Sequence, residues 1–139
     1  MKRLATTLLG IFLIAAFACA KVNVPKNDKV LRPTAKVTKT TIIDFTASWC
    51  APCLRFAPAF EKAAKNLSGQ LNFIKVDIDR FPKTAKAFGV KAVPTIYFLY
   101  PGGGSFFMEG TDAVMFDGED TETFTHFLRE HCLGGRGDE

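Results

Sequence analysis

The chain has 139 residues, which is enough for one domain with its own hydrophobic core. Hydrophobic residues make up 47% of it and charged residues 23%, as in an ordinary soluble globular protein, and 14 phenylalanines against one tryptophan predict a core built largely from Phe. The formal net charge of +4 is too mild to indicate a nucleic-acid partner.

The first 20 residues have the pattern of a secretory signal. A positive start is followed by an apolar run over residues 8–17 and by Ala18-Cys19-Ala20, which matches the small-x-small cleavage rule. The apolar run is shorter than a comfortable membrane span. We therefore expect residues 1–20 to be removed and the mature chain to work outside the cytosol, in the periplasm or, in a eukaryote, in the endoplasmic reticulum lumen or outside the cell. Lipidation of Cys19 is the alternative.

The mature chain is expected to begin with an irregular lead-in. Residues 21–36 contain prolines and basic residues with only scattered apolar positions. The domain itself is expected to span residues 37–133 and to be followed by a polar tail at 134–139. Its first element is predicted at residues 40–46, where β-branched and apolar residues dominate, as they do in a buried parallel strand.

A helix is predicted over residues 52–67, because apolar residues recur there at intervals of three and four. Gly69 ends the run. The predicted apolar stripe consists of Leu54, Ala57, Phe60, Ala64 and Leu67.

A second strand is predicted at residues 71–77. A short helix follows, with Asp79 as its cap and Pro82 in its first turn. Its apolar face is expected to carry Phe81, Ala85 and Phe88.

A third strand is predicted at residues 95–100. Two weaker strand candidates, 105–108 and 114–116, are expected to pair through a loop near Gly110. The last helix is predicted to follow a cap at Asp120, with a stripe formed by Phe124, Phe127 and Leu128. The element order is β-α-β-α-β-β-α, with a parallel crossover and an antiparallel closing pair. It predicts one α/β domain with a central sheet flanked by helices.

Two cysteines lie where the first predicted strand passes into the first helix, in the sequence Trp49-Cys50-Ala51-Pro52-Cys53. A cysteine at a helix N-terminus faces the positive end of the helix dipole and unpaired N–H groups, which favour the thiolate over the thiol. Cys50 is therefore the predicted attacking thiolate, and Cys53 the more buried resolving thiol. Pro52 supports the helix start, since the N–H that it lacks would be unpaired there. A purely structural disulfide is disfavoured, because so short a loop restrains the unfolded chain little.

No metal site is predicted. A single C-x-x-C lacks the second ligand pair of a zinc site, and His126 and His131 have no cysteine partner at zinc-ribbon spacing. Cys132 is interpreted as a buried small hydrophobic residue. We expect no cofactor other than a redox-active disulfide between Cys50 and Cys53.

The chain resembles the thioredoxin family from about residue 42 to residue 128. The motifs that carry the resemblance stand at the family's spacing and are Ile43-Asp44-Phe45-Thr46-Ala47-Ser48-Trp49-Cys50-Ala51-Pro52-Cys53, Pro58, Lys75-Val76-Asp77, Phe88-Gly89-Val90 and Val93-Pro94-Thr95. From Tyr97 onward the sequence looks more like the C-terminal periplasmic domain of the transmembrane reductant conductor DsbD. The resemblance implies a thioredoxin-like fold with a mixed sheet, from which the family's first helix is missing or degenerate.

The resemblance also implies a role for a carboxylate behind the cysteines. Asp44 belongs to a strand that should be buried, so its pKa should rise and it could exchange a proton with Cys53. A structural pairing of Asp44 with Lys75 is the other interpretation, and the two are compatible.

Three further residues are implied to form the substrate site. Pro94 would follow a cis peptide bond beside the cysteines, and Val93 would pair its main chain with an extended substrate strand. Trp49 would pack beside the disulfide and shield it.

The function that the resemblance implies is exchange of electrons with protein disulfides by a monomer, supplied by an upstream redox donor that could be membrane-bound. Ala51-Pro52 resembles the Gly-Pro of reductive thioredoxins more than the Pro-His of strong oxidants, so we predict a reductant or relay. A disulfide oxidase or isomerase is the alternative within the same chemistry. A module that only holds extended polypeptide at Pro94 is the alternative from another class, but it would not need both cysteines.

Overall fold

The computed structural model describes residues 22–26, 28, 32–110, 116 and 121–134. The predicted signal at residues 1–20 and the predicted cap Asp120 lie outside this described part, as do residues 114–115 and all of the predicted tail after Gly134. No helix among the described residues is long and apolar enough to cross a membrane.

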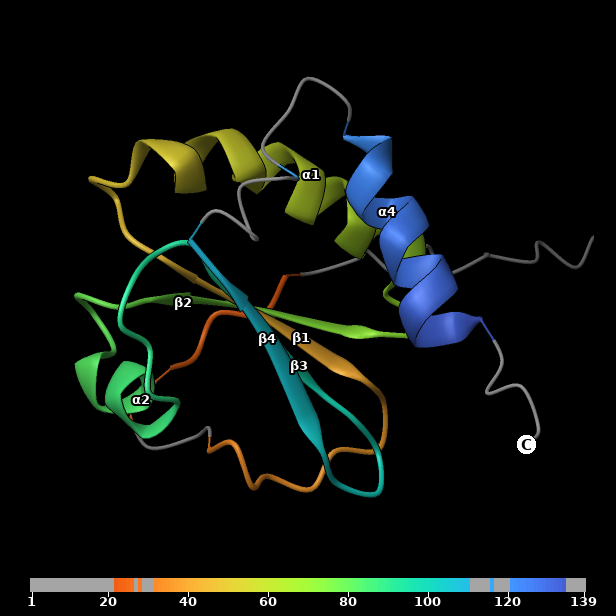
Figure 1. The fold of residues 1–139 in the computed structure, drawn as a ribbon, viewed down its shortest axis with the longest axis horizontal. Coiled ribbons are helices and arrows are strands. Elements are labelled where there is room, and N and C mark those ends of the chain that lie inside the picture. Colours follow the sequence, from red (N-terminus) through yellow and green to blue (C-terminus); the bar gives the residue numbers. More distant parts are fainter. Residues whose placement is uncertain (1–21, 27, 29–31, 111–115, 117–120, 135–139) are drawn as a thin grey trace, which may run out of the picture.

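Four strands form one mixed sheet in the order β2-β1-β3-β4 (Figure 1). The strands are β1 (Thr41–Thr46), β2 (Asn72–Asp77), β3 (Thr95–Leu99) and β4 (Ser105–Glu109). β1 is parallel to β2 and antiparallel to β3, and β3 pairs antiparallel with the edge strand β4. The predicted crossover and antiparallel closing pair are thus confirmed. Phe116 lies in a turn rather than in the additional strand predicted at 114–116.

Helices cover both faces of the sheet (Figure 1). On one face α1 (Ala51–Leu67) packs against α4 (Glu122–Leu128), which continues into a π-helical turn, η1 (Arg129–Leu133). The short helix α2 (Pro82–Ala87) lies on the other face. All six residues of β1 are buried, as expected for a central strand that is covered on both sides.

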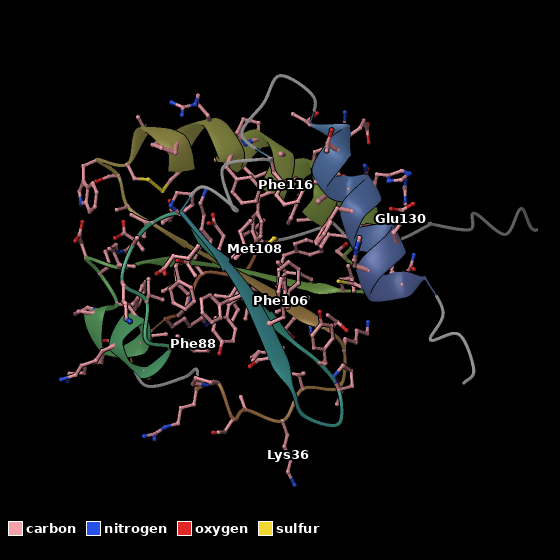
Figure 2. The ribbon with its side chains drawn as sticks, in the orientation of Figure 1. Lys36, Phe88, Phe106, Met108, Phe116 and Glu130 are labelled. Carbon is pink, nitrogen blue, oxygen red and sulfur yellow. A yellow bond between two sulfur atoms is a disulfide. The ribbon has the colours of Figure 1, made fainter. Side chains whose placement is uncertain are left out.

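Aromatic rings dominate the core on the face that α1 and α4 cover. Phe124 of α4 lies 5.0 Å from Phe56 and 5.0 Å from Phe116 between ring centroids, and Phe60 lies 5.5 Å from Phe73 of β2. Figure 2 shows Phe116 on this side of the sheet and Phe88 on the side of α2. The predicted phenylalanine core is confirmed.

The buried face of α1 differs from the predicted stripe. Leu54 is 60% exposed and Ala57 is only half-buried. The buried residues are Cys53, Phe56, Ala59, Phe60, Ala63, Ala64 and Leu67. This face has the same three-and-four spacing, and it buries the ring of Phe56 where the predicted face would bury Leu54, so more apolar area leaves water.

The lead-in is more ordered than the sequence predicts. The Asn23 N–H donates to the Phe73 carbonyl and the Lys75 N–H donates to the Asn23 carbonyl, both at 2.9 Å, so Asn23 forms a parallel bridge on β2. Among the described residues before β1 there is no helix. The missing first helix of the family is therefore consistent with the described part of the chain.

Asp28 of the lead-in caps α2, a role that the sequence assigns wrongly to Asp79. Its carboxylate accepts the N–H groups of Lys83 and Thr84 at 2.8 and 2.7 Å. Burial acts to raise the pKa of Asp28, but the hydrogen bonds from Thr84 and Lys83 and the charge of Lys83 together lower it. Asp79 instead accepts a hydrogen bond from the Trp49 side chain.

Candidate active site

The two cysteines lie where β1 gives way to α1, and a disulfide joins them at the N-terminal end of that helix (Figure 2). Cys50 is the N-cap residue, and its Sγ accepts the Cys53 N–H at 3.2 Å. Pro52 occupies the first helical turn, as predicted. Cys50 is 4% exposed and Cys53 1% exposed, so in the disulfide form Cys50 is the more accessible of the two by a narrow margin.

Apolar residues from two other loops pack around the disulfide. Ile78, just after β2, and Val93, just before β3, contact the cluster formed by Ala47 and the two cysteines. Ile78 is not among the site residues predicted from the sequence. A usable signal was present, because β1 and β2 are parallel and the residues that follow their carboxyl ends meet at one edge of the sheet.

Trp49, which precedes Cys50 in the chain, lies largely at the surface, and its predicted role as a shield of the disulfide stays a prediction. Its side chain is 67% exposed, and its Nε1–H donates to the Asp79 Oδ2 at 2.8 Å. This hydrogen bond links the indole to the segment that follows β2. Trp49 therefore offers an exposed apolar ring next to Cys50.

The loop before β3 carries the predicted cis peptide bond, between Val93 and Pro94. Because Val93 packs against the cysteine cluster, this loop lies beside the disulfide as expected. Within the described part of the chain, no hydrogen bond uses the Val93 N–H or C=O. Two main-chain groups next to the disulfide thus have no partner among the described residues.

Asp44 is completely buried on the side of the sheet that α1 covers. Ile42 packs into the core beneath α1 whereas Ile43 packs on the other side, so strand alternation points Asp44 toward the helix that carries Cys53. Neither carboxylate oxygen has a hydrogen-bond partner among the described residues. Burial raises the pKa of Asp44 to about 7, with the charge of Lys75 acting in the opposite direction. The predicted rise in its pKa is confirmed.

Lys75 lies opposite Asp44 in the β1–β2 register, but the predicted pairing between them is replaced by another contact. The Lys75 Nζ lies 3.8 Å from Oε1 of Glu61 on α1. That exposed carboxylate is better solvated than Asp44, so the ammonium group extends toward water instead of following the buried carboxylate inward. Lys75 thus acts on Asp44 through its charge and not through a hydrogen bond.

A cavity of about 270 Å³ opens beside the resolving cysteine. It is lined from α1 by Cys53, Leu54 and Ala57, and from the end of β2 by Lys75 and Asp77. Lys75 and Arg80 bring two positive charges to this cavity, and Asp77 brings one negative charge. Water can approach the buried cysteine from the side of this cavity.

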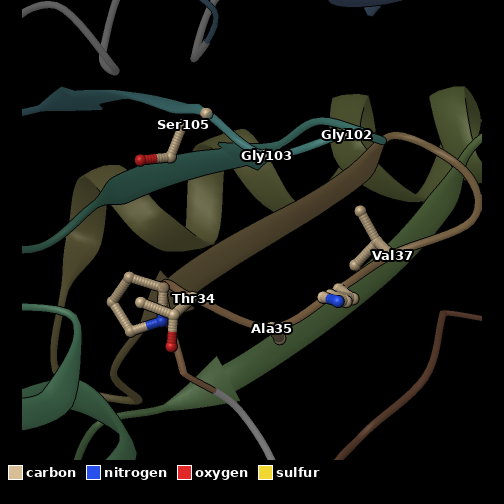
Figure 3. A pocket seen from close by; sticks show the side chains of 9 residues that line it. Thr34, Ala35, Val37, Gly102, Gly103 and Ser105 are labelled. Atoms are coloured by element: carbon tan, nitrogen blue, oxygen red, sulfur yellow. The ribbon is translucent and has the colours of Figure 1, made fainter.

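A second cavity, of about 650 Å³, lies at the opposite end of the sheet (Figure 3). Thr34, Ala35 and Val37 face Gly102, Gly103 and Ser105 across it. Among the described residues that line it, only Lys36 is titratable. Among the described residues no three His, Cys, Asp or Glu side chains gather into a possible metal site. The groups suited to chemistry are therefore concentrated around the disulfide.

Comparison with known proteins gives one consistent result. The family model described as Thioredoxin matches residues 21–115. Thioredoxin H4 of Arabidopsis thaliana is 48% identical over 64 residues, which cover 46% of this chain and 54% of that protein. An H-type thioredoxin of Oryza sativa subsp. indica is 40% identical over 80 residues, which cover 58% of this chain and 65% of the relative. The matched region thus spans between about half and two thirds of these curated relatives.

Solved structures agree over a larger part of the fold. The thioredoxin of Malassezia sympodialis, described as a member of a pan-allergen family, superposes with a TM-score of 0.62 at 26% identity, covering 81% of this chain and 91% of that one. The germline-specific thioredoxin Deadhead of Drosophila melanogaster superposes with a TM-score of 0.54 at 25% identity, covering 67% of this chain and 81% of that one.

Proposed function

The chain belongs to the thioredoxin family, and we propose that it is a thiol–disulfide oxidoreductase acting on protein disulfides through Cys50 and Cys53. The observation that carries the proposal is a disulfide at a helix N-terminus, packed against a loop whose Val93 main-chain groups are unpaired within the described residues. A bond that served only for stability would need neither the helix terminus nor the unpaired main chain beside it.

The reaction starts from the reduced protein. The Cys50 thiolate attacks one sulfur of a substrate disulfide, forming a mixed disulfide and releasing the other substrate sulfur as a thiolate, which takes a proton from solvent. Cys53 then loses its proton, and its sulfur attacks the Cys50 Sγ. The mixed disulfide breaks, the Cys50–Cys53 bond forms, and the second substrate thiol leaves. Two electrons have passed to the substrate, and a dithiol donor returns the protein to its reduced form.

Asp44 is the group proposed to accept the Cys53 proton. It points toward α1 from a buried position, and its pKa of about 7 means that protonated and ionised forms are both present near neutral pH. A group poised in this way can take up the proton during resolution and return it during reduction.

The substrate is proposed to be an extended polypeptide segment. It would pair its main chain with Val93, as a strand adds to unpaired N–H and C=O groups, and would contact the exposed ring of Trp49. Ala51-Pro52 between the cysteines supports the role of a reductant or relay. We propose further that the protein is a monomer and receives electrons from an upstream donor, with a membrane-bound one among the candidates. The alternative is a disulfide oxidase, in which electrons flow the opposite way, or a disulfide isomerase.

The pattern of residues 1–20 supports a location outside the cytosol, with the periplasm as the proposed compartment. Cleavage after Ala20 and lipidation of Cys19 would produce a free and an anchored form respectively. Mass measurement of the chain recovered from its native host distinguishes these forms.

Reduction of insulin disulfides by dithiothreitol tests the proposed activity. The protein should accelerate the reaction over the thiol alone, and Cys50→Ser should abolish the acceleration. A wild-type protein that gives no acceleration would exclude the oxidoreductase and leave the polypeptide-binding module. The reduction potential of the cysteine pair then decides direction, with a value near about −270 mV indicating a reductant and one near about −120 mV an oxidant.

A further inference from the structure

Hydrogen bonds join the end of β4 to the loop that lies beside the disulfide. Oε1 of Glu109, the last residue of β4, accepts the N–H of Lys91 at 3.0 Å and the N–H of Ala92 at 2.9 Å. The next residue, Gly110, donates its N–H to the Pro94 carbonyl at 3.0 Å. Three hydrogen bonds from two consecutive residues therefore hold the loop of residues 91–94 to the sheet.

A side chain of the neighbouring strand holds the same loop. The Thr95 hydroxyl donates to the Ala92 carbonyl at 2.7 Å, and Thr95 is the register partner of Glu109 in the β3–β4 pair. Ala92 is thus fixed through both its N–H and its C=O. Val93, the next residue, has neither group engaged within the described part of the chain. The loop is therefore anchored at Ala92 and at Pro94, on the two sides of Val93.

We propose that Glu109 is a positioning residue for substrate binding, which fixes the Val93 main chain where an extended substrate segment pairs with it. This inference rests on the proposed oxidoreductase function. A carboxylate that accepts two main-chain N–H groups binds more strongly than a neutral acceptor does. Without it the loop would sample other arrangements, and the substrate would have to order it on binding. Glu109 itself need not contact the reacting sulfur atoms.

This role predicts a defect confined to polypeptide substrates. Loss of the Glu109 contacts should weaken binding of a substrate that pairs with Val93 and leave the sulfur chemistry of Cys50 unchanged. A small disulfide such as 2-hydroxyethyl disulfide has no main chain to pair. It therefore reports on the cysteines alone.

The test compares three Glu109 variants of the full chain with a matched control. Glu109→Ala removes both hydrogen bonds, and Glu109→Asp keeps the charge but is one methylene shorter. Glu109→Gln keeps a carbonyl oxygen at the same reach. Glu130→Ala removes an equivalent charge from an exposed carboxylate that pairs with His126 on the C-terminal helix. For each protein, KM and kcat are measured with insulin, and the rate is measured with 2-hydroxyethyl disulfide.

Glu109→Ala and Glu109→Asp should raise the KM for insulin about three- to tenfold, the range expected for losing one or two hydrogen bonds. Their kcat and their rate with the small disulfide should stay within about twofold of the wild-type values. Glu109→Gln should keep the KM for insulin close to that of the wild type. Should Glu109→Ala fail to fold, Glu109→Asp and Glu109→Gln decide the question. An unchanged KM in the folded variants, or an equal loss with both substrates, would overturn the positioning role while an active wild type kept the proposed function. An inactive wild type would overturn both.

Discussion

Two regions of the molecule place a cysteine in opposite environments. Cys50 begins α1, and its sulfur accepts a main-chain N–H, so the backbone presents positive partial charge to it. Cys132 lies in η1, near the end of the last helix, and shares a cavity with the aromatic residues Phe98, Tyr100, Phe106 and Phe127. Burial raises the pKa of the Cys132 thiol to about 11. The same side chain is thus prepared for thiolate chemistry in one region and for apolar packing in the other.

The neighbours of Cys132 reinforce this difference. His131 directly precedes Cys132 in the chain, but its ring stacks on Phe127 with centroids 4.2 Å apart, and its Nδ1 lies 3.0 Å from the Phe127 carbonyl. The imidazole is therefore engaged with the preceding helical turn. Cys132 packs against the core as a small apolar residue, but it is only partly buried, whereas the sequence predicts full burial. The comparison teaches that the backbone around a cysteine, and not the residue type, selects its chemistry.

After Cys50→Ser, which should abolish activity, Cys53→Ser should give the largest effect, because it removes the thiol that resolves the mixed disulfide. Intramolecular attack by Cys53 would be replaced by slower attack from dithiothreitol in solution, so insulin turnover should fall on the order of a thousandfold. Mass spectrometry should then find substrate attached to Cys50. The control, Cys132→Ser, should retain turnover within about twofold. Substrate trapped on Cys132 would break the distinction between the two regions.

Asp44→Asn tests whether the region around the disulfide, unlike the region around Cys132, carries a charge that destabilises the folded state. The charge in question is the ionised Asp44 carboxylate. The folded state holds the Asp44 proton up to a pKa of about 7, whereas an unfolded carboxyl releases it near its ordinary value of 3.8. Between these values the folded state binds more protons, so wild-type stability should fall as pH rises. The loss is complete above about pH 7 and is on the order of 4 kcal/mol at most.

Denaturant unfolding of the oxidised proteins at pH 4 and pH 8 measures this effect. The wild type should lose stability relative to Asp44→Asn between the two values, because the amide does not titrate. Release of the mixed disulfide should also slow in the variant if Asp44 accepts the Cys53 proton. Parallel stability profiles for the two proteins would show that Asp44 does not titrate in this range.

Much of the fold follows from local sequence patterns. The strands β1, β2 and β3 appear where continuous apolar and β-branched runs predict them, and the start of α1 places Cys50 as expected. The raised pKa of Asp44 follows from its place in a fully buried strand. These features depend on residues close together in the chain, which is why the sequence alone suffices for them.

The remaining features depend on contacts between distant residues. Asp28 caps a helix that begins more than fifty residues later, and Glu109 reaches back 17 residues to Ala92. Trp49 is turned toward solvent by a hydrogen bond to Asp79, 30 residues away. No local spacing encodes such pairs. The prediction of the buried face of α1 was wrong for another reason. Two faces of that helix have the same apolar spacing, and only tertiary packing decides that Phe56 is buried and Leu54 is exposed.

The most direct test of the contrast between the two regions is the alkylation rate of each thiol in the reduced protein at pH 7, followed by mass spectrometry after brief exposure to iodoacetamide. Cys50 should react first and Cys132 last, with rates that differ on the order of a hundredfold. This figure allows for the Cys132 thiolate, which is scarcer at pH 7 but more basic and therefore more nucleophilic. Cys53 should react at an intermediate rate. Labelling of Cys132 or Cys53 ahead of Cys50 would contradict the account that the start of α1 creates the reactive thiolate.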